Sequence, residues 1–185
     1  MAVVYDQDAE TVKLYVNDQV YEEQGRLGSG WEDAYIGKSP SYGAHFSGSI
    51  DEVRIYNYAL TQSEIKALYA GGTTPSATAS PTPSTQPTPA LPSRGLVVYY
   101  PFDGDARDYS GNGNDGSNYG ATFVSGISGG RALQFDGKDD YVSALVNINP
   151  DVMPQMTMIA WVRADDDSGT IISHDNGGYD DMIAQ

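Results

Sequence analysis

The sequence predicts an all-β fold that contains one short helix and is interrupted near its middle. Runs of β-branched and aromatic residues recur along the chain, as at 11–17 and 156–164, and such runs between turn residues are typical of strands. Only one stretch carries both the start and the stop signals of a helix. Residues 73–93 hold six of the ten prolines and no charge, so this stretch cannot bury enough apolar surface to fold.

The first strand-rich segment is predicted to begin with a hairpin. Residues 2–6 and 11–17 are β-branched and aromatic, and the acidic turn QDAE lies between them. Further strands are expected at 19–24, 33–38 and 49–60. The apolar residues of the last run break strict alternation, which predicts a bulge near Asp51 and Glu52.

The predicted helix follows at the end of this segment. Thr61 is in the position of an N-cap residue, and Glu64 three residues later completes a capping box. Gly71 and Gly72 then supply a stop signal. The sequence therefore predicts a helix over 62–70.

The second strand-rich segment follows the proline-rich stretch. Strands are expected at 95–102, 131–137, 140–145, 156–164 and 169–174. In residues 156–164 both alternating faces are apolar, which favours a strand covered on both sides. Trp161 is therefore predicted to be a core residue.

The composition divides the chain into segments 1–72 and 95–185, joined by a disordered Pro/Thr/Ser linker at 73–94. The linker is expected to be extended and polyproline-like, reaching up to roughly 65 Å at about 3.1 Å per residue. A plain tether and an O-glycosylated spacer both agree with this composition.

Several classes of protein are excluded by composition. A net charge of −15 would repel the phosphates of nucleic acid. The chain has no Cys, so it forms no disulfide and uses no thiol nucleophile. No apolar run approaches the roughly 20 residues of a membrane span, and the first ten residues lack the basic and apolar regions of a signal peptide.

Longer motifs resemble a known family. The runs YYPFDGDARDYSGNGNDGSNYGATFV, GGRALQFDGKDDYVS and MTMIAWVR resemble the N-terminal half of a laminin-G-like, concanavalin A-like jelly roll. The runs AVVYD, VKLYVN, YIGKS and FSGSIDEVRIYNYALTQSEIKALY resemble the C-terminal half of the same family. The resemblance implies a two-sheet antiparallel jelly-roll sandwich with the short helix closing the domain.

The two halves occur in reversed order, which leaves two arrangements. The chain could be a window on a tandem array, with the tail of one module before the head of the next, or one circularly permuted module. We favour the window, because the family has one or two further strands between those at 169–174 and 2–6. In either case the two halves can dock. Edges exposed by missing strands predict a strand-exchanged dimer.

The resemblance also implies a structural Ca²⁺ near the acidic turns. The expected ligands are Asp103, Asp105 and Asp108, with Asp51 as a distant partner because the first and last strands of such a sandwich are neighbours. An EF-hand is excluded, since Tyr119 stands where its bidentate Glu should be. The alternative is that these residues form Asx-turns.

A second acidic turn contains Asp136, Asp139 and Asp140. Asp136–Gly137 before an alternating strand predicts a hairpin turn. A metal role is the alternative.

Function is predicted from the same residues and the family. Exposed aromatics on turns could stack on sugars, and the candidates are Trp31, Tyr35, Tyr42, Tyr119 and Tyr179; ordinary packing is the alternative. The glucanase motif Glu-x-Asp-x-x-Glu fails, because Ser49 and Arg54 replace its two Glu residues, and His45 and His174 are isolated.

We therefore expect a non-catalytic carbohydrate- or protein-recognition module, stabilised by calcium, in a secreted or cell-surface multidomain protein. Its partner would be a glycan or an extracellular protein surface. The alternatives are a structural spacer or adhesion repeat, and an accessory fragment of a carbohydrate-active enzyme.

Overall fold

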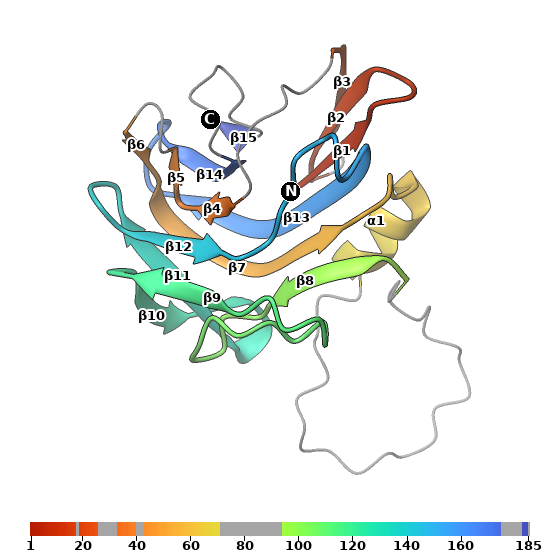
Figure 1. The fold of residues 1–185 in the computed structure, drawn as a ribbon. Coiled ribbons are helices and arrows are strands. Elements are labelled where there is room, and N and C mark those ends of the chain that lie inside the picture. Colours follow the sequence, from red (N-terminus) through yellow and green to blue (C-terminus); the bar gives the residue numbers. More distant parts are fainter. Residues whose placement is uncertain (18, 26–32, 40–42, 71–93, 175–182, 185) are drawn as a thin grey trace.

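A computed structural model describes the chain except for residues 18, 26–32, 40–42, 71–93, 175–182 and 185 (Figure 1). The predicted linker lies almost wholly outside the described residues. No helix in the described part is long and apolar enough to cross a membrane.

The described residues form two main antiparallel sheets, a two-stranded sheet and one α-helix. The eight-stranded sheet has the order β10-β11-β7-β13-β1-β2-β3, with β8 also paired to β7. Its strands are β1 (Ala2–Asp6), β2 (Thr11–Val16), β3 (Gln19–Gln24), β7 (Ser47–Tyr56), β8 (Leu96–Tyr100), β10 (Thr122–Ser125), β11 (Arg131–Asp136) and β13 (Gln155–Ala164).

The five-stranded sheet has the order β15-β14-β4-β12-β9. Its strands are β4 (Ala34–Ile36), β9 (Gly116–Tyr119), β12 (Tyr141–Ala144), β14 (Thr170–His174) and β15 (Ile183–Ala184). Strands β5 (Lys38–Ser39) and β6 (Ala44–His45) pair with each other. These sheets form the concanavalin A-like sandwich that the sequence predicts.

The two strand-rich segments are built into one sandwich. Strand β1, red in Figure 1, pairs with the blue β13 along its whole length, from Ala2 opposite Ile159 to Asp6 opposite Gln155. Strand β7 pairs with β8, β11 and β13, all from the second segment. The predicted docking of the two halves is therefore confirmed. The gene sequence on either side of this chain would distinguish a window on a tandem array from a circularly permuted module.

The predicted bulge occurs in β7. Glu52 has a φ of 55°, which is uncommon for a residue with a side chain. Strand β7 pairs with β11 up to Ile50 and with β8 from Val53 onward. Asp51 and Glu52 therefore lie where β7 changes partner on this side and pair with neither β11 nor β8, while Asp51 pairs with Trp161 of β13 on the other side.

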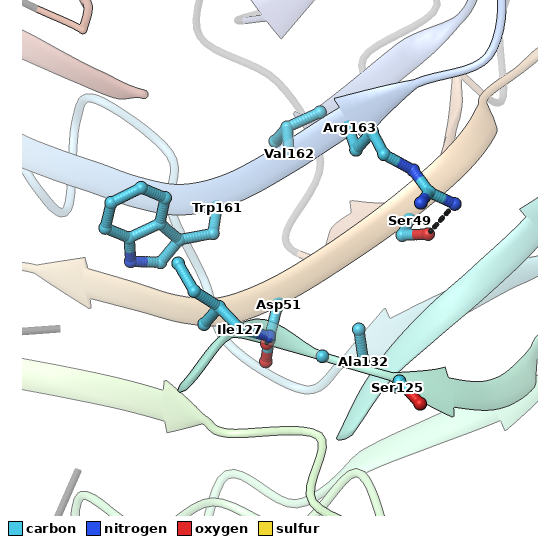
Figure 2. Close-up of a pocket in the computed structure, with 9 residues that line it drawn as sticks. Ser49, Asp51, Ser125, Ile127, Ala132, Trp161, Val162 and Arg163 are labelled. Carbon is cyan, nitrogen blue, oxygen red and sulfur yellow. Dashed lines mark hydrogen bonds between the residues drawn. The ribbon is translucent and has the colours of Figure 1, made fainter. Parts of the chain in front are cut away.

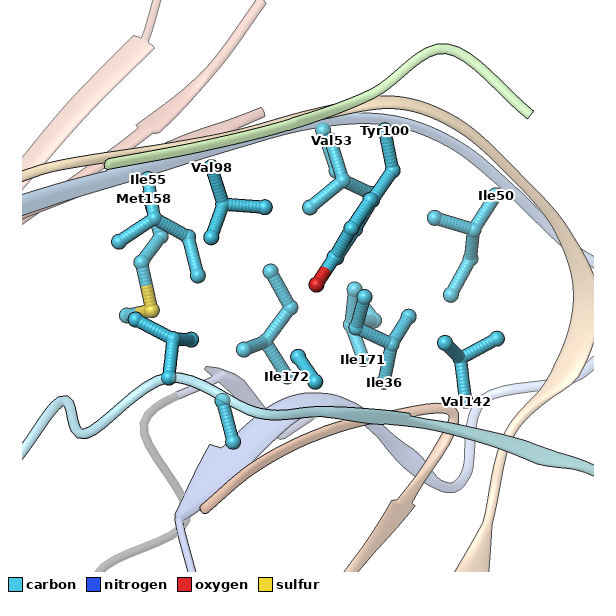
Figure 3. Packing of buried hydrophobic residues seen from close by; sticks show 14 of the residues in the cluster. Ile36, Ile50, Val53, Ile55, Val98, Tyr100, Val142, Met158, Ile171 and Ile172 are labelled. Atoms are coloured by element: carbon cyan, nitrogen blue, oxygen red, sulfur yellow. The ribbon is translucent and has the colours of Figure 1, made fainter. Parts of the chain in front are cut away.

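The main core lies between the two sheets (Figure 3). Ile50, Val53 and Ile55 of β7 face Ile36 and Ile172 of the five-stranded sheet, and all five are fully buried. At the bulge the alternation restarts, which is why Ile50 and Val53 can both point inward.

Helix α1 (Gln62–Ala70) covers the outer face of the eight-stranded sheet. Its buried residues Ile65 and Leu68 pack on Val4, Tyr56 and Ile159 in a second, smaller core. The predicted capping box is present: Thr61 N donates to Glu64 Oε2 (2.8 Å), and Glu64 N donates to Thr61 Oγ1 (3.3 Å).

Two predictions are wrong. Asp136–Gly137 does not close a hairpin, because β11 pairs with β7 in one sheet whereas β12 pairs with β4 and β9 in the other. The turn instead carries the chain between the layers. Trp161 is half-buried on the outer face rather than in the core, because it alternates with Ala160 and Val162, which face the main core.

Candidate functional site

The outer face of the five-stranded sheet carries a cluster of tyrosines. Val142 and Ile36 of neighbouring strands point into the core, so the alternating residues Tyr141 and Tyr35 point outward. Tyr119 of β9 is directly opposite Tyr141 of β12. Sheet alternation and register thus gather three rings from separate parts of the chain on one face.

The rings contact one another in defined geometries. Tyr119 and Tyr141 are stacked, with centroids 4.5 Å apart and planes 13° apart. Tyr35 meets Tyr141 edge-on at 6.2 Å. Lys38 Nζ lies 3.4 Å from the Tyr141 centroid and 4.4 Å from that of Tyr35. We call Tyr35, Lys38, Tyr119 and Tyr141 the tyrosine cluster.

Tyr119 is the most open ring of the cluster. It is 49% exposed, whereas Tyr141 is half-buried with Tyr119 and Lys38 against its ring. Tyr35 and Tyr119 were sequence candidates. Tyr141 and Lys38 were missed, although the alternation of Tyr141 and Ser143 with buried Val142 and Ala144 was a usable signal. Trp31, Tyr42 and Tyr179 lie outside the described residues.

The expected calcium ligands are divided between two places. Asp108 accepts hydrogen bonds from Tyr99 N (3.0 Å), Ser110 N (2.8 Å), Ser110 Oγ (2.8 Å) and Asn114 N (3.0 Å). Burial would raise the pKa of Asp108, but these hydrogen bonds outweigh it and lower the pKa. Asp105 is paired with Arg107. Both residues therefore hold their own loop together, as the Asx-turn alternative predicts.

Asp51 and Asp103, in contrast, hold the same turn. Asp51 Oδ2 accepts from Ile127 N (2.9 Å), and Asp103 Oδ1 accepts from Arg131 N (2.7 Å). This turn contains the short 3₁₀ helix Ile127–Gly129 and comes directly before β11. The structure thus brings together Asp51 of the first segment and Asp103 of the second, as expected from neighbouring strands.

One oxygen at this turn lacks a partner. Asp51 is only 5% exposed, and its Oδ1 is buried without a hydrogen bond. Burial raises the pKa of Asp51 from 3.8 to about 6, and the nearby Glu52 and Asp103 charges act in the same direction. An orphaned buried carboxylate oxygen beside a second carboxylate fits a hard cation. Asp51 and Asp103 fit the implied calcium, whereas Asp105 and Asp108 do not fit the same site.

A pocket of about 240 Å³ adjoins Asp51 on the outer face of the eight-stranded sheet (Figure 2). Trp161 and Arg163 of β13 line it together with Ser49 of β7, and Arg163 Nη2 donates to Ser49 Oγ (3.4 Å). The Trp161 ring also meets Tyr69 of α1 edge-on at 5.7 Å. The pocket lies beside the bulge, where β7 has one residue more than β13 between the pairs Asp51–Trp161 and Arg54–Ile159.

The second acidic turn also gathers carboxylates. One oxygen each of Asp136, Asp139 and Asp140 lie within 4.8 Å of one another. Asp136 N donates to Asp140 Oδ2 (2.9 Å), and Lys138 N donates to Asp136 Oδ1 (2.9 Å). These hydrogen bonds are those of a turn. Whether the three carboxylates also bind a metal ion is a separate question for experiment.

Comparison with known proteins bears on the first segment. A laminin G family model, described as the concanavalin A-like lectin/glucanases superfamily, matches residues 1–66. These residues are similar to that superfamily, and the match covers 66 of the 185 residues. The laminin G-like match, together with the two-sheet sandwich, supports a general kind of module that binds carbohydrate or protein. No curated protein matches the chain, and no solved structure matches it.

Proposed function

We propose that this laminin G-like chain is a non-catalytic recognition module for a glycan or an extracellular protein surface, stabilised by calcium. Its setting would be a secreted or cell-surface multidomain protein, since laminin G-like domains are typically extracellular. The tyrosine cluster is the observation that carries the proposal.

The cluster has the chemistry of a sugar platform. The Tyr119 ring is half exposed and is held in place by stacking on Tyr141. An aromatic ring of this kind offers an apolar face for the C–H groups of a sugar, and its hydroxyl can hydrogen-bond. Lys38 adds a cation beside the rings. The strands fix all of these groups before a ligand arrives, which lowers the entropic cost of binding.

The non-catalytic part of the proposal is supported by the carboxylates beside the pocket. Glu52 Oε2 receives a hydrogen bond from Arg54 Nη2 (2.6 Å) and another from the Tyr99 hydroxyl (3.0 Å). Glu52 is therefore engaged in a buried ion pair, and is not available as the acid or nucleophile that would complement Asp51.

A glycan array and a matched pair of variants test the binding function. We expect the wild-type module to retain a subset of glycans, and Tyr119→Ala to reduce that binding at least tenfold. Tyr109→Ala is the control, because Tyr109 is also strongly exposed (59%) but has no part in the cluster. Equal loss in both variants, or no loss in either, would remove the tyrosine cluster as the platform. A folded module that binds neither glycan nor protein would support the spacer alternative.

The calcium part would use Asp51 and Asp103 as carboxylate ligands. A bound divalent ion would supply positive charge to the orphaned Asp51 oxygen and would join the two segments of the chain. Asp139→Asn is the control variant, because it removes a carboxylate from the second acidic turn and leaves Asp51 and Asp103 unchanged.

Terbium luminescence can locate the cation. Trp161 lines the same pocket as Asp51, so its excited indole should transfer energy to a Tb³⁺ ion bound there. We expect Asp51→Asn to abolish the sensitised emission, and Trp161→Phe to abolish emission while calcium still raises the melting temperature. Emission that survives both changes but disappears with Asp139→Asn would move the cation to the second acidic turn.

A further inference from the structure

We propose that strand β3 is a self-association edge, at which two copies of this chain pair antiparallel about a two-fold axis at Tyr21. The pairing would join the two eight-stranded sheets into one continuous sheet. This inference does not depend on the ligand or on calcium.

Strand β3 is exposed along its whole length. It is the last strand of its sheet in the described part of the chain, and all six of its residues are exposed. In Figure 1 the strands β2 and β3 lie beside each other at the β1 end of the eight-stranded sheet. Val20 is 42% exposed and Tyr21 is 57% exposed. The strand contains neither Pro nor Lys, and its only charged residues, of the kind that can also protect a sheet edge, are Glu22 and Glu23.

The register of the hairpin decides which backbone groups point outward. Val16 pairs with Gln19 across a two-residue connection, and such a closing pair is hydrogen-bonded. Hydrogen-bonded pairs then alternate along the ladder. Gly25 N donates to Glu10 O (2.8 Å). The pair Glu10–Gly25 is thus hydrogen-bonded, as the alternation from Val16–Gln19 requires. Gln19, Tyr21 and Glu23 therefore bond to β2, while Val20, Glu22 and Gln24 direct their N–H and C=O groups outward.

This parity restricts the pairing between copies. The outward groups of one copy must meet those of the other, so the two-fold axis must pass through a β3 residue opposite itself. An axis at Glu22 would place two Glu side chains directly opposite each other, which is destabilising. An axis at Val20 would pair only residues 19–21 of the strand.

An axis at Tyr21 satisfies every condition. It pairs Val20 with Glu22 and Gln19 with Glu23 of the second copy, so no like charges are opposed. The two Tyr21 residues meet in a non-hydrogen-bonded pair, where side chains approach most closely and aromatic pairs stabilise a sheet. Glu22 is already paired with Lys13 in its own chain (3.4 Å). The remaining repulsion comes from the net charge of −15 per copy, so added salt should favour the dimer.

Cysteine trapping tests the axis directly, because the chain has no Cys of its own. At a non-hydrogen-bonded pair the two Cα atoms lie about 4.5 Å apart, within the range that a disulfide spans. We expect Tyr21→Cys to form a disulfide-linked dimer under mild oxidation. Glu22→Cys is the matched control: its own counterpart would lie two residues further along the ladder and should not react. Equal cross-linking at both positions would overturn the proposed axis.

Sedimentation equilibrium of the unoxidised protein tests the edge. We expect the dimer fraction of the wild type to increase with protein concentration and with salt. Glu22→Pro removes an outward N–H group but no hydrogen bond to β2. It should therefore weaken association at least tenfold and leave the melting temperature unchanged. Glu22→Ala, which keeps the N–H group, should associate like the wild type. A wild type that stays monomeric at millimolar concentration overturns the proposal. So does a dimer unaffected by Glu22→Pro, which would instead indicate strand exchange elsewhere.

Discussion

Replacing Asp51 by Asn measures what the buried carboxylate costs the fold. Asp51 is 5% exposed, its Oδ2 accepts from Ile127 N, and its Oδ1 has no partner. Asn keeps an oxygen for the Ile127 N–H and carries no charge. The change therefore isolates the ionisation of one group at the junction of the two segments.

The magnitude follows from the pKa. Burial raises the pKa of Asp51 from 3.8 to about 6, so the folded protein keeps a proton between these values that the unfolded chain has lost. The stabilisation is complete below pH 3.8 and disappears as the pH rises through about 6. Roughly two pKa units correspond to about 3 kcal/mol.

Urea unfolding of the wild type and Asp51→Asn, in chelator, gives the required free energies. Other carboxylates titrate in both proteins, so their contributions cancel in the difference. We expect the variant to gain about 3 kcal/mol relative to the wild type between about pH 4 and about pH 7. With saturating calcium the gain should shrink or reverse, because a bound cation favours the ionised form. A difference constant within about 0.5 kcal/mol over this range, in chelator, would refute the reasoning.

Three further changes test the packing by the same unfolding assay. Gly126→Ala should cost about 1–3 kcal/mol, because an added Cβ would lie 2.6 Å from Asp51 Oδ2; Gly25→Ala, with no atom within 4 Å, should have little effect. Thr61→Ala should cost about 1 kcal/mol by removing the helix cap. Thr157→Val should cost about 1–3 kcal/mol, because Thr157 Oγ1 accepts from Leu60 N and donates to Tyr58 O, both at 2.9 Å. No cost at Thr157 would show that these two groups find other partners.

Local patterns were sufficient for most individual elements. The hairpin of β1 and β2, the bulge at Asp51–Glu52 and the capping box of Thr61 and Glu64 were all predictable. Each depends on residues close in sequence, whose side-chain period, turn chemistry or backbone hydrogen bonds the sequence displays directly.

The site residues required the tertiary structure. Tyr119 and Tyr141 meet because β9 and β12 are neighbours. The local sequence around either residue does not predict that these two strands pair. Trp161 was assigned to the core from the composition of its strand, but only the tertiary structure shows that its face of β13 is the outer one, where it lines a pocket.

The sequence by itself determined that this protein is built from strands in two segments around a proline-rich interruption, because alternation, turn residues and proline content act locally. The family resemblance led us to expect Asp51 near Asp103, but only the tertiary structure decided that β1 lies against β13 and that the two carboxylates bond to the backbone of the same turn. Those contacts join residues from opposite sides of the interruption. Their positions depend on how strands from both segments share one sheet, which no local pattern encodes.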